Sequence, residues 1–398
     1  MAESAAATTT TADRPLDCRR QEFTLPPGTH YLNCAYMGPL SERVVLAGIA
    51  GIRRKCAPHR ITPRDFFADG ESARRLFAAL LGASDPTRVA IIPAVSYGIA
   101  TVARNETCRP GQTIVVAGEQ FPSNVHAWRR LADRTGAELR TIVAPDSGRR
   151  GEAWNTAVLD AIDARTAIVA LPQVHWTDGT RFDLVAIGES ARHAGAAFVI
   201  DATQSLGAHP FDLRAIGADA VLCAAYKWLL GPYAIGLAWY GPRYSGGEPL
   251  EETWIARAGS EDFRQLIHYR DDYQPGAARF DVGEWSNFIL LPMLVAALEQ
   301  VSEWGADRIQ AYCARLTREA LEEARTLGFT VEDPEWRGSH LFGLRAPAGI
   351  DLVRLQASLD RQGVSVSLRG TAMRVSPNVY NDAADVNALL GVLRETVT

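Results

Sequence analysis

Lysine is almost absent from this chain of 398 residues. Only Lys55 and Lys227 occur, and arginine supplies the remaining positive charge. The two side chains are equivalent as solvated charges, but only the lysine amine can be deprotonated by burial and attack a carbonyl to form a Schiff base. Composition alone therefore leaves two interpretations of Lys227, in CAAYKWLLGP: a surface residue after a strand, or a reactive amine.

Paired metal ligands and paired cysteines are also lacking. The six cysteines, at positions 18, 34, 56, 108, 223 and 313, lie far apart and form no C-x-x-C pair. This spacing argues against a zinc site and a disulfide framework, and it suits a reducing cytoplasm. The eight histidines form no H-E-x-x-H motif or other short-range ligand pair, so we expect no metal.

Long apolar runs and blocks of positive charge are missing as well. No window reaches the roughly 18 apolar residues of a membrane span, and the start, MAESAAATTTTADRP, lacks the apolar centre of a signal peptide. The formal net charge of -5 gives no basic footprint for nucleic acid. We predict a cytoplasmic protein that acts on a small molecule, with a disordered tail over residues 1–20 and neither a nucleic-acid nor a membrane partner.

Seven short apolar runs alternate with helical patterns, which predicts an α/β fold with a mainly parallel seven-stranded sheet. The predicted strands cover residues 88–93, 113–118, 137–144, 166–172, 196–202, 219–226 and 234–240. A loop-rich connection follows to about residue 274, and from residue 291 the pattern becomes that of a smaller α+β unit. We therefore expect a large domain over 21–290, with an N-terminal segment that packs on the smaller unit, and a C-terminal domain over 291–398.

The phosphate-binding motifs G-x-G-x-x-G and G-x-x-x-x-G-K-[ST] are absent, but AVSYG, residues 94–98, follows a strand and opens a helix. It lies one substitution from the G-x-S-x-G elbow, so a serine hydrolase with Ser96, Asp201 and His209 is one interpretation. Ala94 disfavours it by replacing the glycine that permits the strained turn. The same strand-turn-helix would also form an anion site for a phosphate.

Asp201 and Lys227 end two successive predicted strands, at the edge where open α/β sheets bind ligands. Alone, an aspartate at this point is often only a helix cap. Pyridoxal phosphate requires an amine for its aldehyde, a carboxylate for its ring nitrogen, a cup for its phosphate and a flat surface against its ring. Lys227, Asp201, the Ser96-Tyr97 turn and Phe121 would supply these groups in that order.

The motifs DATQSLG, AAYKWLLGP and AMRVSPNVYN together resemble the class V aminotransferase family of fold-type I pyridoxal phosphate enzymes. This family includes cysteine desulfurases, kynureninases and isopenicillin N epimerase-like proteins. The resemblance runs from Tyr31 to Asn381. It implies the pyridoxal phosphate-dependent transferase fold, pyridoxal 5'-phosphate as cofactor, an amino-acid substrate and a homodimer with its site at the subunit interface.

The resemblance also implies a role for individual residues at the cofactor. Lys227 would form the Schiff base and shuttle protons, while Asp201 would keep the ring nitrogen protonated. The other expected cofactor contacts are Gln204 to the ring oxygen O3′ or the aldimine region, Phe121 stacked on the ring, and Ser96, Tyr97 and Tyr226 at the phosphate. The segment FDVGEWSN would reach the phosphate of a partner subunit through Ser286 or backbone N–H groups. Phe121 has the alternative of being a core aromatic.

For the substrate, the resemblance makes Arg374 the bidentate partner of the carboxylate; the alternative is a surface arginine on an edge strand. Asn33, His175 and Trp176 would line the pocket. Arg369 is either a second anion contact or a solvated loop residue.

One departure from the family pattern bears on the reaction. Cysteine desulfurases carry a nucleophilic cysteine before the carboxylate-binding arginine, whereas VSLRGTAMR has none. An enzyme persulfide is therefore disfavoured, and Cys34 and Cys223 are predicted to be inert core thiols. Phe121 and Tyr226 follow the lyase-like branch, which favours β-elimination by a C–S or related lyase. Transamination is the first alternative and epimerisation of an amino acid the second.

Overall fold

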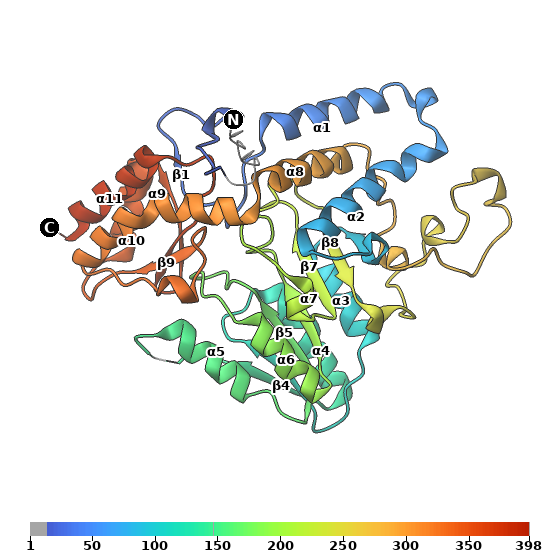
Figure 1. Cartoon of the computed structure of the whole chain (residues 1–398), viewed down its shortest axis with the longest axis horizontal. Coiled ribbons are helices and arrows are strands. Elements are labelled where there is room, and N and C mark those ends of the chain that lie inside the picture. Colours follow the sequence, from blue (N-terminus) through green and yellow to red (C-terminus); the bar gives the residue numbers. More distant parts are fainter. Residues whose placement is uncertain (1–13, 146, 398) are drawn as a thin grey trace, which may run out of the picture.

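A computed structural model describes residues 14–145 and 147–397 of the chain. Its centre is a seven-stranded sheet with the order β2-β8-β7-β6-β5-β3-β4 (Figure 1). The strands are β2 (Val89–Ile92), β3 (Thr113–Ala117), β4 (Glu138–Ile142), β5 (Thr166–Pro172), β6 (Ala197–Asp201), β7 (Ala220–Ala224) and β8 (Gly236–Tyr240). All seven predicted strands are confirmed, each end within two residues of its prediction.

The direction of each strand decides which strand ends lie at the same edge of the sheet. Strands β4, β3, β5, β6 and β7 are mutually parallel, and β8 is antiparallel to both β7 and β2. The sheet is thus mainly parallel, as predicted. Since β2 and β7 both oppose β8, the carboxyl ends of β2, β6 and β7 lie at one edge of the sheet. This edge is where the strand-end residues were expected to gather.

Helices cover both faces of the sheet, which explains why strands such as β6 and β7 are buried along their whole length. The helices of the large domain are α1 (Glu42–Lys55), α2 (Ala68–Leu81), α3 (Val95–Asn105), α4 (His126–Thr135), α5 (Arg150–Asp160), α6 (Leu184–Ala194), α7 (Leu213–Ile216) and α8 (Leu290–Trp304). In helix α6 the residues at both ends explain where the helix begins and stops. Asp183 caps its first N–H groups, and Gly195 ends it with a left-handed φ of 71°.

A smaller unit stands at one end of the molecule (Figure 1). It contains α9 (Ala306–Thr326), α10 (Leu352–Arg361) and α11 (Ala383–Val397), the sheet β11 (Ser367–Arg369), β12 (Ala372–Val375) and β9 (Phe342–Arg345), and the pair β1 (His30–Tyr31) and β10 (Val364–Ser365). It has a core of its own, which includes Leu32 from the N-terminal segment. Leu32 thus contributes the N-terminal segment to the core of the smaller unit.

Helix α8 falls inside the predicted C-terminal domain but packs elsewhere. Its buried residues Leu291, Leu294 and Leu298 belong to the core of the large domain. The amphipathic pattern predicted a helix correctly, yet it carries no information on the partner of the apolar face. Packing therefore argues for a domain boundary after Trp304 rather than at residue 291.

The predicted tail is only partly tested, because residues 1–13 lie outside the described residues. Leu16 and Arg20 contact the body of the protein, so the prediction of disorder is wrong for these residues. Leu16 is buried and its carbonyl accepts a hydrogen bond from Arg315. Arg20 forms an ion pair of 2.9 Å with the buried Asp385 of α11. These contacts join residues far apart in sequence, which local composition does not reveal.

The connection after β8 contains short 3-10 turns but no α-helix or strand between residues 241 and 274. It projects from the end of the molecule opposite the smaller unit (Figure 1), as the loop-rich composition predicted. Within the described part of the chain, no helix is both long and apolar enough to cross a membrane.

Candidate active site

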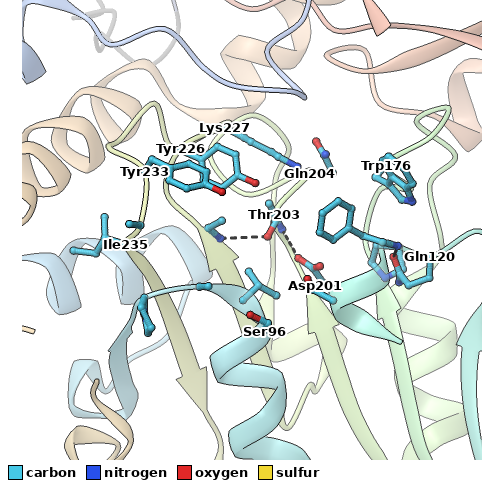
Figure 2. Close-up of a pocket in the computed structure, with 18 of the residues that line it drawn as sticks. Ser96, Gln120, Trp176, Asp201, Thr203, Gln204, Tyr226, Lys227, Tyr233 and Ile235 are labelled. Carbon is cyan, nitrogen blue, oxygen red and sulfur yellow. Dashed lines mark hydrogen bonds between the residues drawn. The ribbon is translucent and has the colours of Figure 1, made fainter. Parts of the chain in front are cut away.

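A cavity of about 350 Å³ opens at the carboxyl edge of the sheet. Figure 2 shows side chains from several strand ends converging on it. It is lined by Pro93, Ala94, Val95, Ser96, Gln120, Phe121, Ser123, Pro172, Val174, Trp176, Asp201, Thr203, Gln204, Ala224, Tyr226, Lys227, Tyr233, Ala234 and Ile235. The predicted residues that it brings together are thus Lys227, Asp201, Ser96, Phe121, Gln204, Tyr226 and Trp176.

Lys227 follows β7 and is only 6% exposed, which excludes the surface interpretation. Burial, together with the nearby Arg374, lowers the pKa of its amine to about 8, whereas Asp201 opposes the shift. The amine nitrogen Nζ lies 5.5 Å from the ring centroid of Phe121 and 5.6 Å from that of Tyr226. The neutral, nucleophilic form of this amine is therefore far more populated near physiological pH than that of a lysine in water.

Asp201 ends β6 and lies on the floor of the cavity in Figure 2. Its Oδ1 accepts a hydrogen bond of 3.0 Å from the backbone N–H of Thr203, and the Thr203 hydroxyl accepts one from the N–H of Ala224 in β7. Thr203 thus joins the ends of β6 and β7. Burial raises the pKa of Asp201, so this carboxylate gains from a positively charged partner inside the cavity.

The turn between β2 and α3 supplies backbone donors. Ala94 is extended, and no side chain caps the first turn of α3. The N–H groups of Tyr97 and Gly98 both donate to the carbonyl of Ala94, while Val95 and Ser96 line the cavity at the helix N-terminus. An uncapped helix start with a hydroxyl beside it is suited to hold a phosphate.

Tyr97 was expected at the phosphate, but its side chain does not line the cavity. Its hydroxyl donates a hydrogen bond of 2.8 Å to Glu251 instead. Successive residues in the first turn of a helix point about 100° apart, so Ser96 faces the cavity and Tyr97 faces away. The prediction for the Tyr97 side chain is therefore corrected.

The serine-hydrolase interpretation fails on geometry. His209 contacts Gln173 and the carbonyl of Pro210 and does not line the cavity with Ser96 and Asp201. Burial lowers the pKa of His209. A nucleophilic serine needs a base within hydrogen-bond reach, and His209 does not occupy that place.

Aromatic side chains form the walls of the cavity. Phe121 is 38% exposed, which excludes the core interpretation, and it meets Trp176 edge to face with 5.4 Å between ring centroids. On the other side, Tyr226 and Tyr233 lie 4.6 Å apart. The amine of Lys227 lies within 5.6 Å of the ring centroids of both Phe121 and Tyr226, so a flat ring bound at this amine has aromatic surface beside it.

Gln204 lies between Lys227 and the small unit. Its Oε1 accepts a hydrogen bond from the Trp228 indole, and its Nε2 donates one to the carbonyl of Ala35. An amide nitrogen carries two hydrogens, so one donor of Gln204 is left for a group in the cavity. The predicted contact with the cofactor oxygen remains compatible with this arrangement.

Arg374 lies on β12, the central strand of the small sheet, and is 1% exposed. This excludes a surface arginine on an edge strand. Its Nη1 donates to the carbonyl of Trp176 at 2.8 Å, and its Nε has no partner. Arg374 and Arg369 both lower the pKa of Lys227. They therefore act on the cavity electrostatically, although neither contributes to its lining.

Besides Tyr97 and the two arginines, three further predicted residues are not brought to the cavity wall. His175 is fully buried, with its ring nitrogens bonded to Thr177 and the carbonyl of Gly118. The side-chain oxygen of Asn33 accepts from the Ser367 hydroxyl, which in turn accepts from Arg374, so Asn33 orients Arg374 instead of lining the pocket. Ser286 is buried and does not line the cavity of its own chain.

Sequence reasoning missed Gln120, Thr203 and Tyr233. The Nε2 of Gln120 is buried without a hydrogen-bond partner in a residue of the cavity wall, which is typical of a group that a ligand satisfies. Thr203 lies two residues beyond Asp201 in DATQSLG, so strand-end position was a usable signal for it. No pattern in GPYAIG pointed to Tyr233, because loop residues carry no periodicity.

The side chains fit pyridoxal phosphate, whose four requirements are a neutral amine, a buried carboxylate, an uncapped helix start and aromatic faces. They fit a metal ion poorly, because no cluster of three or more His, Cys, Asp or Glu side chains in the described ranges is placed to hold one.

Comparison with known proteins agrees with this fit. The family model described as Aminotransferase class-V matches residues 62–389. An uncharacterized aminotransferase of Bacillus subtilis is 27% identical over 78% of this chain and 79% of its own. Isopenicillin N epimerase of Streptomyces clavuligerus is 26% identical over 94% and 96%. The cystine C–S lyase C-DES, solved with its product cysteine persulfide, superposes with a TM-score of 0.82 at 17% identity, covering 93% of this chain and 98% of that one.

Proposed function

This chain belongs to the class V aminotransferase family, and on that premise we propose that it catalyses β-elimination from a cysteine-derived or related amino acid. Its cofactor is pyridoxal 5'-phosphate. The observation that carries the proposal is the buried Lys227 amine, with its pKa lowered to about 8, in one cavity with the Asp201 carboxylate.

Each group of the cavity then has a task. The bound cofactor supplies an electron sink for charge that develops at the substrate α-carbon. Lys227 would anchor the cofactor and, once free, would take the proton from that carbon and deliver a proton to the departing sulfur group, because burial lowers the pKa of its amine to about 8. Asp201 holds a proton on the ring nitrogen. Val95 and Ser96 hold the phosphate through the uncapped start of α3, and Phe121 supports the ring face.

The thiols of the chain argue against an enzyme persulfide. Cys34 is buried, and burial raises the pKa of its thiol to about 11. Cys223 is buried too, and burial raises its pKa well above the ordinary value. A thiolate is needed for sulfur transfer, so these side chains suit a core role. An elimination that releases its sulfur product directly needs no such thiol.

Transamination is the second candidate. It begins with the same proton removal at the α-carbon, but the substrate keeps its β-substituent and the proton would be delivered to the cofactor instead of to a leaving group. The related Bacillus subtilis protein is described as an aminotransferase. Epimerisation, the activity named for the Streptomyces relative, returns the proton to the α-carbon and stands third.

The test is a visible absorption spectrum of the purified protein during addition of a panel of cysteine thioethers, with assays for pyruvate, ammonia and thiol. Equal release of the three products, with the cofactor band restored after turnover, is the expected result. Bleaching of the band that only a keto acid reverses would identify an aminotransferase and overturn the preferred reaction.

Variants of the two lysines test the cofactor itself. Lys227→Ala should lose the band of lysine-bound cofactor and all turnover, because it removes the buried amine. Lys55→Ala is the matched control, since Lys55 is exposed at the end of α1, and it should keep both. Retention of the covalent band in Lys227→Ala would refute the role of this lysine.

We also propose a homodimer in a reducing cytoplasm. All six cysteines, each within the described ranges, are free thiols. The outer face of α1 exposes Val45, Leu46, Ile49 and Ile52, an apolar patch that a second copy would cover. Ser286 does not line its own cavity, and its contact with the phosphate of a partner subunit stays a prediction.

A further inference from the structure

Two guanidinium groups beside the cavity lack a carboxylate partner. Burial lowers the pKa of Arg374 to about 9 and that of Arg369 as well, and the charged groups that act on either are other basic, thiol or phenol side chains, with no carboxylate among the described residues. The Nε atoms of both arginines are buried without a hydrogen-bond partner. Arginines elsewhere in the smaller unit, such as Arg345 and Arg394, are paired with carboxylates.

The α-carboxylate of an amino acid needs only one of these two arginines as a partner. Arg374 is fixed by the carbonyl of Trp176 and by Ser367, so its guanidinium is positioned in advance for one carboxylate. Arg369 lowers the pKa of Arg374 through like-charge repulsion. Two cations without a carboxylate partner repel each other and Lys227, which raises the electrostatic free energy of the ligand-free site. Two anionic groups on a ligand would offset this repulsion.

Arg369 is also held in place before any ligand binds. It ends β11, its Nη1 donates to the carbonyl of Leu368, and its guanidinium carbon lies 5.5 Å from the centroid of the Trp176 ring. Trp176 is itself fixed by a hydrogen bond of 2.6 Å to the carbonyl of Glu119. A stacked guanidinium retains free N–H donors in its plane, so Arg369 is preorganised at the Trp176 side of the cavity.

The size of the cavity directs the substrate toward this side. Asp201 and the start of α3 would hold a bound cofactor, and they line the same cavity of about 350 Å³ as Trp176. The space left for the side chain of an amino acid would therefore extend toward Trp176, and Arg369 is the cation next to Trp176.

We propose that the substrate is an amino acid with a second anionic group on its side chain, a carboxylate or an anion of similar shape, and that Arg369 binds this group. This inference rests on the proposed function, because it takes Arg374 as the partner of the α-carboxylate. Arg369 is then a specificity-determining residue, and neutral amino acids of the same size are poor ligands.

The test measures equilibrium binding to the holoenzyme by titration calorimetry, using glutarate and butyrate, which lack the amine needed for reaction. Charge-assisted hydrogen bonds predict that glutarate binds at least about 10-fold more tightly than butyrate. In Arg369→Gln the preference should fall to about twofold or less, and Arg369→Lys should retain part of it. The matched control is Arg354→Gln, an arginine on α10 with an 88% exposed side chain, which should keep the wild-type ratio.

L-glutamate against L-glutamine, followed through the cofactor absorption band, repeats the comparison with complete amino acids. No preference for the dianion in the wild type, or an unchanged preference in Arg369→Gln, would overturn the inference and leave both arginines to share one carboxylate. This failure is separate from failure of the proposed function, in which no lysine-bound cofactor band appears at all.

Discussion

Lys227 is reactive because of where it lies rather than because of its sequence neighbours. A lysine in water titrates near 10.5, whereas burial and the charge of Arg374 bring the pKa of Lys227 to about 8. The neutral form therefore predominates above about pH 8 and falls to roughly a tenth at pH 7. Since only the neutral amine attacks the cofactor aldehyde, we expect the rate of cofactor attachment to the apoprotein to rise through pH 8.

The two arginines should tune this pH dependence unequally. Arg374 lowers the pKa of Lys227 more strongly than Arg369 does, so Arg374→Gln should move the midpoint of attachment to higher pH by more than Arg369→Gln. Stopped-flow absorbance of reconstitution from pH 6 to 10 measures both shifts, with Arg354→Gln as a control. A midpoint that stays unchanged in Arg374→Gln would contradict the electrostatic explanation.

Single residues were predictable where a strand end fixed their position. Asp201 and Lys227 were found because polar groups at the ends of buried parallel strands meet at one edge. Tyr97 and His175 were misplaced because the direction of their side chains depends on neighbours far away in sequence: Glu251 binds the former, and Gly118 binds the latter.

At the scale of the element, α3 must lie close to the sheet for its first turn to reach the cofactor. Gly98 permits this approach, because a Cβ at this position would lie 2.1 Å from the Cδ2 atom of Leu222 in β7. We expect Gly98→Ala to displace α3, to lower the free energy of unfolding by about 1–3 kcal/mol and to weaken cofactor binding.

Gly391 provides the contrast, since it lies in α11 with no atom within 4 Å of an added Cβ. Gly391→Ala should raise the free energy of unfolding by up to about 1 kcal/mol through helix propensity and leave cofactor binding unchanged. Thermal unfolding measures the stability of both variants, and cofactor titration measures their affinity for the cofactor. Equal effects of the two substitutions on stability and affinity would argue against close packing of α3.

Strands such as β5 and β7 were predictable because apolar residues fill both of their faces, which leaves few alternatives for runs of five to seven residues. The direction of β8 was not. A strand buried on both faces reads the same in either orientation, so its antiparallel pairing with β2 and β7 is decided by topology alone. The sequence therefore predicted that the sheet is mainly parallel but not which strand is the exception.

At the scale of the whole molecule, the exposed face of α1 is the feature that predicts assembly. Leu46 lies at its centre and is 55% exposed. We expect the wild type to sediment as a dimer and Leu46→Glu to shift it toward the monomer, because burying an unpaired carboxylate at an interface is costly. Val353→Glu, on α10 and also exposed, should remain dimeric. A monomeric wild type would refute the proposal.

The scarcity of lysine has a practical consequence for handling the protein. Among its side chains only two primary amines exist, one exposed on α1 and one enclosed beside the cofactor site. Among the side chains, amine-acylating reagents therefore have a single exposed target, Lys55. In a mass spectrum, modification of the second side-chain amine, Lys227, measures the fraction of molecules that have lost the cofactor. Cofactor occupancy can therefore be determined without an absorption measurement.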